Sequence, residues 1–221
     1  GLLGALIERA AYRPLRSAGR LAPLITAIGV SLLLQNAGQL VFGADPKFFP
    51  PLIRSQEALR IGGIAISNIQ IVVLVTAILL MGGLQYVVQR TRFGRAMRAV
   101  SYDAPAAALM GVPVDRVILG TFVLGSCLAA AAGILVGLSN PKIDPLMGLM
   151  PGLKAFVAAV LGGIGSIPGA MLGGILLGVI ETLVTGYLSS TYRDAIAFVV
   201  LVLILLYRPT GLFGAPQTEK V

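Results

Sequence analysis

Glu181 is the residue whose chemistry stands out first, because it is the one carboxylate inside an apolar run of the sequence. A charge at the centre of a membrane-spanning helix costs about 2.5 to 3.5 kcal/mol on insertion scales, so we expect this carboxylate to be neutral, paired or wetted. Lys154, near the outer end of the preceding segment, is expected to lie at a similar depth in the membrane and is therefore the nearest candidate partner. Two roles stay open for Glu181: an ion pair that ties two helices together, or a polar site that receives an ammonium group, an ion or a proton within the membrane.

The sequence offers few other residues that could carry reactive chemistry. The chain has no histidine and one cysteine, Cys127, which removes the commonest general base, the usual metal-ligand sets and any disulfide framework. The glycine-rich stretch LGGIGSIPGAMLGG carries no lysine and lacks the spacing of a phosphate loop. We therefore predict no catalytic residue, no metal site and no cofactor bound by this chain.

The composition is that of a membrane protein. Apolar residues make up 57% of the 221 residues, charged residues only 12%, and the mean hydropathy is +0.92. The net charge of +8 does not indicate nucleic-acid binding, because the basic residues lie at the ends of apolar runs rather than on one amphipathic face. The sequence therefore predicts an all-α protein that crosses the bilayer several times.

Five apolar runs are long enough, or nearly so, to cross about 30 Å of hydrocarbon. Seven residues precede the first charges, too few for a span, so we expect the chain to begin part-way through a helix whose start is missing. Arginines place two polar segments, residues 8–20 and 89–116, in the cytoplasm as loops. Residues 59–66 predict an outer hairpin turning at Gly62 and Gly63. The predicted spans are residues 21–41, 69–88, 117–138, 170–187 and 195–207.

Two polar or broken regions interrupt these spans. Gln35, Asn36 and Gln39 cannot all face lipid cheaply, so they line a pathway or bond to neighbouring helices, and we slightly favour the second. The apolar segment 153–161 is only nine residues long and is followed by glycines and a proline. This pattern predicts either a discontinuous helix or a tight crossing turn, in which backbones approach closely. The candidate residues are Gly162, Gly163, Gly165, Ser166, Pro168 and Gly169.

The cytoplasmic segment 89–116 contains the signals of a short, independently capped helix. Asp103 suits the N-cap, Pro105 the first turn and Gly111 the position after the C-cap. So short a helix is marginal alone in water, so it needs a groove on a partner, packing against its own protein, or a place on the lipid headgroups. The candidate docking residues are Asp103, Ala106, Ala107, Leu109, Met110 and Gly111.

Five blocks of this sequence occur in the order and at the spacing found in one family of transporters. They are ERAAYRPLRS, LITAIGVSLLLQN, GRAMRAVSYDAPAAALMGVPVDRVILGTFVLG, KAFVAAVLGGIGSIPGAMLGGILLGVIE and RPTGLFG. Together they resemble the permease subunit of bacterial high-affinity branched-chain amino acid ABC importers, the Liv type, and its H subunit more than its M subunit. The resemblance runs through nearly all 221 residues.

The resemblance implies a single transmembrane permease domain over residues 1–221, of the branched-chain amino acid and ribose importer type, without the family's N-terminal helices. It implies that residues 103–111 form a coupling helix on an ATPase subunit. The implied partners are a second permease of the M type or a second copy, two cytoplasmic ATPases that bind the ATP, a periplasmic or lipoprotein substrate-binding protein, and the bacterial cytoplasmic (inner) membrane. The alternatives left open are a sugar-type ABC permease and an ion-coupled secondary transporter.

Overall fold

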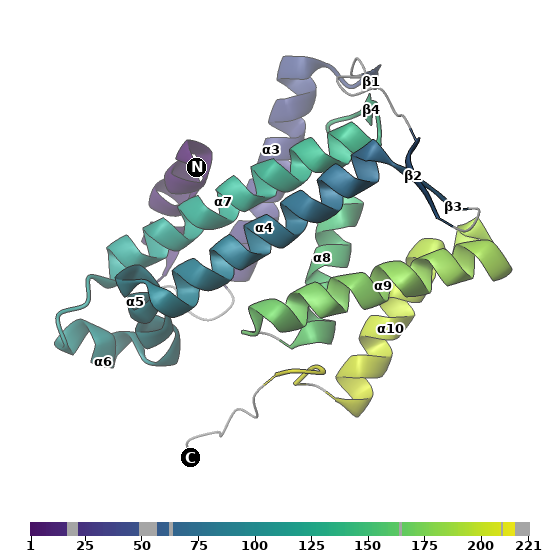
Figure 1. Cartoon of the computed structure of the whole chain (residues 1–221). Helices are drawn as coiled ribbons and strands as arrows, with labels where there is room; N and C mark the ends of the chain where they lie inside the picture. Colours follow the sequence, from purple (N-terminus) through teal and green to yellow (C-terminus); the bar gives the residue numbers. More distant parts are fainter. Residues whose placement is uncertain (17–21, 49–56, 62–63, 164, 209, 215–221) are drawn as a thin grey trace. The chain divides into compact units, whose positions relative to one another are not determined.

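Long apolar helices make up most of the described part of the chain (Figure 1). The computed structural model describes residues 1–16, 22–48, 57–61, 64–163, 165–208 and 210–214, with the backbone alone for 57–61 and 64–65. Within these residues five helices are long and apolar enough to cross a membrane, so the predicted all-α polytopic class is confirmed. Their bounds, within a few residues of the predicted ones, are α3 (Ala22–Phe42), α4 (Asn68–Arg90), α7 (Val114–Ser139), α9 (Ile167–Tyr187) and Ser190–Tyr207, which contains α10 (Arg193–Tyr207).

The chain divides into two compact units, Gly1–Leu146 and Met147–Val221. In the first unit, the opening helix continues further than the sequence suggests, as α1 (Leu2–Ile7), a π-helical stretch η1 (Glu8–Tyr12) and α2 (Arg13–Leu15). The prediction of a loop without helix at residues 8–20 is therefore wrong over residues 8–15, whereas their place on the cytoplasmic side stays a prediction. The charges that indicated a loop are accommodated within the helix, where Glu8 is buried against Arg16.

Helix α1 packs tightly against α7. A Cβ atom added at Gly4 would lie 1.9 Å from Ser126 Oγ, so only glycine allows this approach. About two turns further along the first helix, the ring of Tyr12 lies 4.8 Å from the ring of Phe122, centroid to centroid. These contacts hold the first helix on α7.

Short strands occupy the end of this unit where α3 ends and α4 begins. Strand β1 (Lys47–Phe48) pairs antiparallel with β4 (Lys142–Ile143), and β2 (Glu57–Ile61) pairs with β3 (Ile64–Ser67). The predicted hairpin is confirmed on the described backbone, while its predicted turn at Gly62 and Gly63 lies outside the described residues. Ser67 then caps α4 in a capping box with Gln70.

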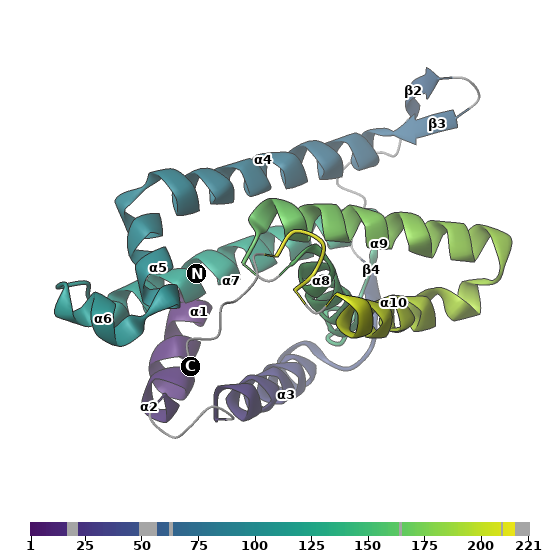
Figure 2. The ribbon, with the colours of Figure 1, turned by 90° about the horizontal axis from the view of Figure 1, so that it is seen from below.

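At its other end, α4 stops at Thr91, whose hydroxyl accepts the Gly94 N–H at 3.1 Å and starts a new helix, α5 (Arg92–Tyr102). Helix α5 turns back against α7 (Figures 1 and 2). A Cβ atom at Gly120 of α7 would lie 2.5 Å from the Phe93 ring, which shows how closely they pack. A third helix, α6 (Ala104–Leu109), follows before α7.

The second unit consists of α8 (Leu149–Gly162), α9, a 3₁₀ turn η2 (Ser190–Tyr192) and α10. Helix α8 starts four residues before the predicted segment 153–161, yet it remains too short for a full span. Its core is apolar and comes from three helices, which places α10 against both α8 and α9. The core residues are Val157, Ala158, Leu177 and Ala197, with Leu201 packed against them.

Candidate functional site

Helix α6 has the caps that its sequence predicts. The Asp103 side chain accepts the Ala106 N–H at 2.9 Å, and Pro105 lies in the first turn. Gly111 adopts φ +81°, which closes the helix with a bond from Val112 N–H to the Ala107 carbonyl at 3.0 Å. The short helix is thus held by its own two ends.

The two faces of α6 differ sharply. Ala107 is only 5% exposed, whereas Leu109 is 90% and Met110 85% exposed. The neighbours of α6 in its unit are α5 and α7. The helix therefore packs against its own protein through one face and presents two large apolar side chains outward from the other, a pattern typical of a docking surface.

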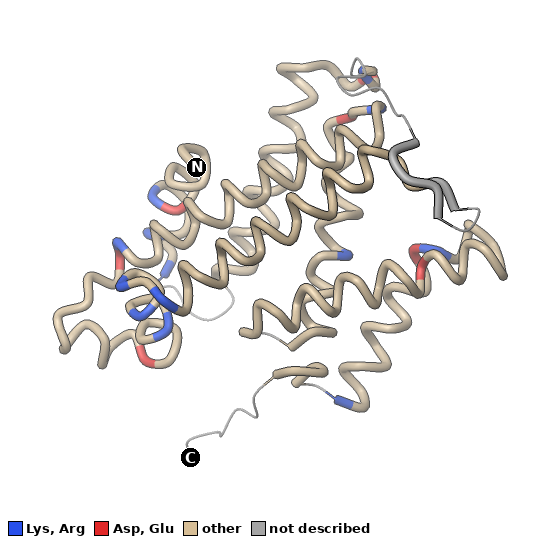
Figure 3. Tube along the Cα trace, in the orientation of Figure 1, with Lys and Arg blue, Asp and Glu red and all other residues tan. Residues whose placement is uncertain are grey.

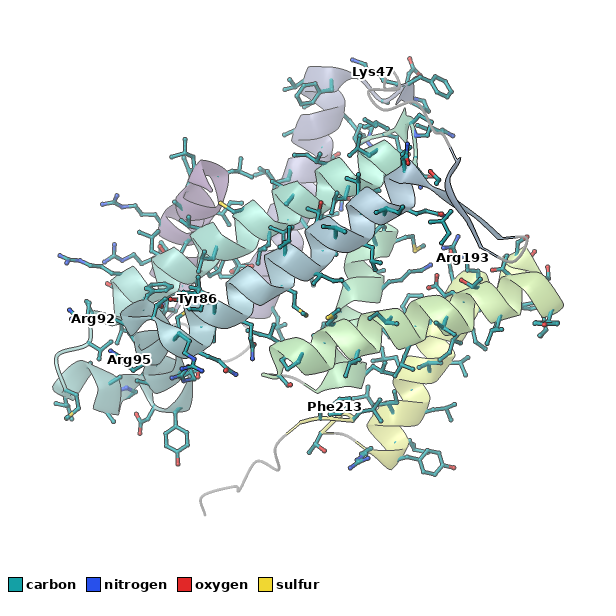
Figure 4. The ribbon with its side chains drawn as sticks, in the orientation of Figure 1. Lys47, Tyr86, Arg92, Arg95, Arg193 and Phe213 are labelled. Carbon is teal, nitrogen blue, oxygen red and sulfur yellow. The ribbon has the colours of Figure 1, made fainter. Side chains whose placement is uncertain are left out.

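Basic residues are concentrated at the end of the unit that carries α6 (Figure 3). In Figure 3 the arginines of the first unit gather where α2, α5 and the start of α7 meet, and Figure 4 labels Arg92 and Arg95 on α5. Arg98 donates a hydrogen bond to the Val88 carbonyl at the end of α4. The positive-inside rule predicts that this end of the unit is the cytoplasmic one.

An ion-pair network that sequence reasoning missed lies beside α6. Asp115, at the start of α7, accepts hydrogen bonds from Arg13 at 2.5 Å and from Arg16 at 2.7 Å, and Arg16 also pairs with the buried Glu8. Arg13 and Asp115 are 102 positions apart, so no local pattern could have found this contact. The network ties the first helix to the first turn of α7, which follows α6 after a four-residue link.

The glycine-rich segment forms a tight turn between antiparallel helices, which is one of the two arrangements left open by the sequence. Helix α8 ends at Gly162 and α9 begins with Ser166 as its N-cap, whose hydroxyl accepts the Gly169 N–H at 3.1 Å. Pro168 lies in the first turn of α9. Gly163 and Gly165 have φ angles of +103° and +98°, which favour glycine.

Close contact across this turn involves most of the predicted glycines. A Cβ atom at Gly162 would lie 2.0 Å from the Gly169 carbonyl oxygen, and one at Gly169 would lie 2.4 Å from that of Gly162. At Gly165, by contrast, no heavy atom of the described residues would lie within 4 Å of an added Cβ atom. Gly165 is therefore needed for its backbone angle alone.

The segment that follows α10 folds back onto this turn. The Leu212 N–H donates to the Leu161 carbonyl at 2.9 Å, and the Phe213 N–H donates to the Gly162 carbonyl at 3.0 Å. These carbonyls belong to the last turn of α8, where no partner within the helix remains. Residues 210–214 thus cap α8 through the backbone, and the side chain of Phe213 stays 55% exposed (Figure 4).

Gln35 and Asn36 bond within their own helix. Gln35 Nε2 donates to Ser31 Oγ at 3.1 Å, and Asn36 Nδ2 donates to the Leu32 carbonyl at 2.7 Å. In the described part of the chain neither side chain bonds to a neighbouring helix, so the favoured interhelical interpretation is not supported within this chain. A pathway role for the two residues stays a prediction.

Glu181 lies in the second unit among charged partners and is itself only 5% exposed. Lys154 Nζ is 2.9 Å from Glu181 Oε1, which is the ion pair predicted from the similar depth of the two residues in the membrane. Arg193 Nε donates to Glu181 Oε2 at 3.0 Å, and Lys154 also lies 2.7 Å from Asp194 Oδ1. Oε1 accepts no hydrogen bond of suitable angle from the described residues, so its contact with Lys154 is ionic rather than an aligned hydrogen bond.

This cluster has balanced charge, with two carboxylates and two cations. Arg193 (labelled in Figure 4) and Asp194 come from the start of α10, which the sequence analysis did not connect with Glu181. Because both oxygens of Glu181 already contact a cation, little of its charge is left to receive a ligand. The geometry favours the structural interpretation of the pair. Among the described residues, no group of three or more His, Cys, Asp or Glu residues is placed to hold a metal ion.

We predict that Glu181 and Lys154 stabilise the second unit together. In a double-mutant cycle of Glu181→Gln and Lys154→Met, thermal unfolding of the purified protein should give an interaction energy of about 0.5 to 3 kcal/mol. Arg208→Met is the matched control, since it removes a cation at the other end of α10, about 22 Å further along the helix. Its effect should add to that of Glu181→Gln. Additive losses for Lys154→Met, with uptake lost only in Glu181→Gln, would instead favour a pathway role.

Comparisons with known proteins bear on the whole chain. Residues 1–205 match the family described as branched-chain amino acid transport system / permease component. The high-affinity branched-chain amino acid transport system permease protein BraD of Pseudomonas aeruginosa is 47% identical over 99% of this chain and 72% of its own length. LivH of Escherichia coli K12, which carries the same descriptive name, is 46% identical over 97% of this chain and 71% of its own length.

More distant similarity extends to a sugar transporter. The fructose import permease protein FrcC of Rhizobium meliloti is 30% identical over 72% of this chain and 47% of its own length. No solved structure matches the chain. With a family match over nearly its full length and relatives above 45% identity, the chain belongs to the family of branched-chain amino acid transport system permease components.

Proposed function

We propose that this chain is the integral-membrane permease subunit of an ATP-driven importer and forms part of the translocation path for branched-chain amino acids. One observation carries the mechanism: the capped helix α6 presents Leu109 and Met110 outward at the basic end of its unit. A rigid helix with an apolar tip can transmit the movement of a docked ATPase to the spans on either side of it. Family membership gives the direction and the chemical class of the cargo.

The connections of α6 suit this role. Helix α5 links it to α4, and α7 follows it after four residues. The pairs that Asp115 forms with Arg13 and Arg16 extend the connection to the first helix. A displacement of α6 would therefore reach α4 through α5, α7 through the four-residue link, and the first helix through the ion-pair network.

Membership of this permease family supports the proposed partners. Two cytoplasmic ATPases bind the ATP and dock on α6 and its counterpart, which lies on a second permease subunit of the M type or on a second copy of this chain. A substrate-binding protein delivers the amino acid from outside the bacterial cytoplasmic membrane. This chain itself binds no cofactor.

Reconstitution with these partners tests the proposal. Vesicles that contain the permease, its partner permease, the ATPases and the binding protein should accumulate labelled leucine when ATP is supplied on the ATPase side. Accumulation should stop with a non-hydrolysable ATP analogue and should not respond to an imposed proton or sodium gradient. Uptake driven by such a gradient without ATP would replace the proposal with an ion-coupled transporter.

The similarity to FrcC keeps a sugar importer as the second candidate. Competition separates the two in the same vesicles, because excess unlabelled isoleucine or valine should suppress leucine uptake while excess fructose should not. An ion-coupled transporter finds less support, since both oxygens of Glu181 contact cations already.

A further inference from the structure

A pocket of about 200 Å³ opens in the first unit at the end of α3. It lies between the last turns of α3 and the loop after α7, where the β1–β4 pair joins the two segments. Helix α3 starts beside α2 and its arginines, and 21 residues of helix then cover about 31 Å. The pocket is therefore on the side of the membrane opposite the coupling helix, where an importer meets its substrate.

Strand register decides which side chains face this pocket. Lys47 is the partner of Ile143 and Phe48 is the partner of Lys142 across the antiparallel pair. Paired residues share one face of a ribbon, and successive residues alternate. Lys47 and Ile143 line the pocket, whereas Phe48 and Lys142 do not.

The pocket is mostly apolar but carries charges of both signs. Phe42, Ile143 and Pro145 supply the apolar surface, and Asp45, Asp144 and Lys47 supply the charges. The Leu146 N–H donates to Asp144 Oδ1 at 2.8 Å, which fixes this carboxylate. Within the described residues, Lys47 forms no ion pair with either aspartate, although all three line one small pocket (Lys47 is labelled in Figure 4).

We propose that this pocket is a transient binding site for a free α-amino acid with an aliphatic side chain. Lys47 binds its carboxylate, Asp144 and Asp45 bind its ammonium group, and the apolar wall receives its side chain. The volume supports a ligand of few atoms, since pockets for drug-sized molecules measure about 300 to 1,000 Å³. A pocket lined by a cation and by carboxylates that do not pair with it matches a zwitterion, whereas a sugar offers no charge to pair with them. The assignment rests on the proposed function and adds a site to it.

Binding of labelled leucine to the purified complete transporter, without its binding protein, tests this assignment. Lys47→Met and Asp144→Asn should each raise the dissociation constant for leucine by about ten-fold to one-hundred-fold, the usual effect of losing a hydrogen bond to a charged group. Lys142→Met is the matched control, because it removes the same charge from the other face of the same strand pair. Its dissociation constant should equal that of the wild type.

Competing ligands show which charge each residue binds. Leucine amide lacks the carboxylate charge, so its affinity should not change in Lys47→Met. The carboxylic acid 4-methylpentanoate lacks the ammonium group, so its affinity should not change in Asp144→Asn. Equal losses for all three ligands would show a general disturbance of the pocket and overturn the assignment.

Further outcomes separate this assignment from the proposed function. If the wild-type transporter drives ATP-dependent leucine uptake but binds no free leucine saturably, the pocket assignment fails and the proposed function stands. The assignment also fails if Lys142→Met weakens leucine binding as much as Lys47→Met does. It fails too if Lys47→Met changes only the concentration of binding protein needed for uptake, because Lys47 then contacts the binding protein rather than the free amino acid. If no branched-chain amino acid is taken up, the proposed function fails, and this assignment with it.

Discussion

Replacing Leu109 and Met110 together with aspartate should abolish ATP-driven leucine uptake while leaving the amount of permease in the membrane unchanged. Both side chains are almost fully exposed, so the change removes no contact that holds the chain together. If they are the apolar anchors for an ATPase, losing them costs about 2 kcal/mol or more of association free energy, which is about 30-fold in affinity. Two carboxylates in an apolar groove add a desolvation penalty.

Three measurements on this variant test whether α6 is the coupling helix: uptake in vesicles, permease content of the membrane, and co-purification of the ATPase subunits. The matched control exchanges the two residues, Leu109→Met with Met110→Leu. It keeps both apolar tips at nearly the same volume and should keep uptake close to the wild-type rate. If the aspartate variant transports normally and retains its ATPases, α6 is not the coupling helix.

Helix α6 could be predicted from the sequence because its signals are local. Asp103, Pro105 and Gly111 each act within four residues of their own position, and the structure shows the hydrogen bonds and the φ angle that these residues predict. Helix α5 was missed although Thr91 gives it a comparable N-cap. The arginines of this stretch predict a cytoplasmic loop, and that interpretation took no account of the Thr91 N-cap.

Contacts between distant segments were not predictable in the same way. No sequence pattern links Arg13 with Asp115. The charges around Glu8 predict a loop, because nothing in the local sequence shows that the helix continues and buries this carboxylate. The return of Leu212 and Phe213 onto α8 uses backbone groups, which the side-chain sequence does not encode directly. Lys154 and Glu181 were an exception, since helices joined by a short turn must run antiparallel and meet at equal depth.

The polar residues of α3 illustrate a further limit. Gln35 and Asn36 each form a hydrogen bond within their own helix. A polar group in the membrane needs a hydrogen-bond partner, and for both side chains that partner lies only four residues away. Depth alone therefore does not distinguish a pathway residue from a self-satisfied one. A partner's position, or a ligand's, is needed for that distinction.

Gly162→Ala should destabilise the second unit severely, because the added methyl group meets backbone rather than a movable side chain. Its Cβ atom would lie 2.0 Å from the Gly169 carbonyl oxygen and 2.2 Å from the Gly169 carbonyl carbon. Helices α8 and α9 would have to separate, which also disturbs the contact between Gly173 and the Ala158 carbonyl further along the pair. Overpacking of this kind costs about 1 to 3 kcal/mol, and more where backbone must move.

Gly178→Ala in α9 is the matched control for this prediction. No heavy atom of the described residues would lie within 4 Å of its Cβ atom, and alanine is preferred over glycine inside a helix by about 0.5 to 1 kcal/mol. The two variants make the same chemical change in the same helix pair, yet their effects on the thermal unfolding of the purified protein should have opposite signs. Equal stability of the two variants would mean that α8 and α9 do not meet at the glycine turn as closely as the Gly162–Gly169 contact requires. Because the turn holds α8 against the helix that carries Glu181, loss of this contact should also separate Lys154 from Glu181 and remove their interaction energy in the Gly162→Ala background.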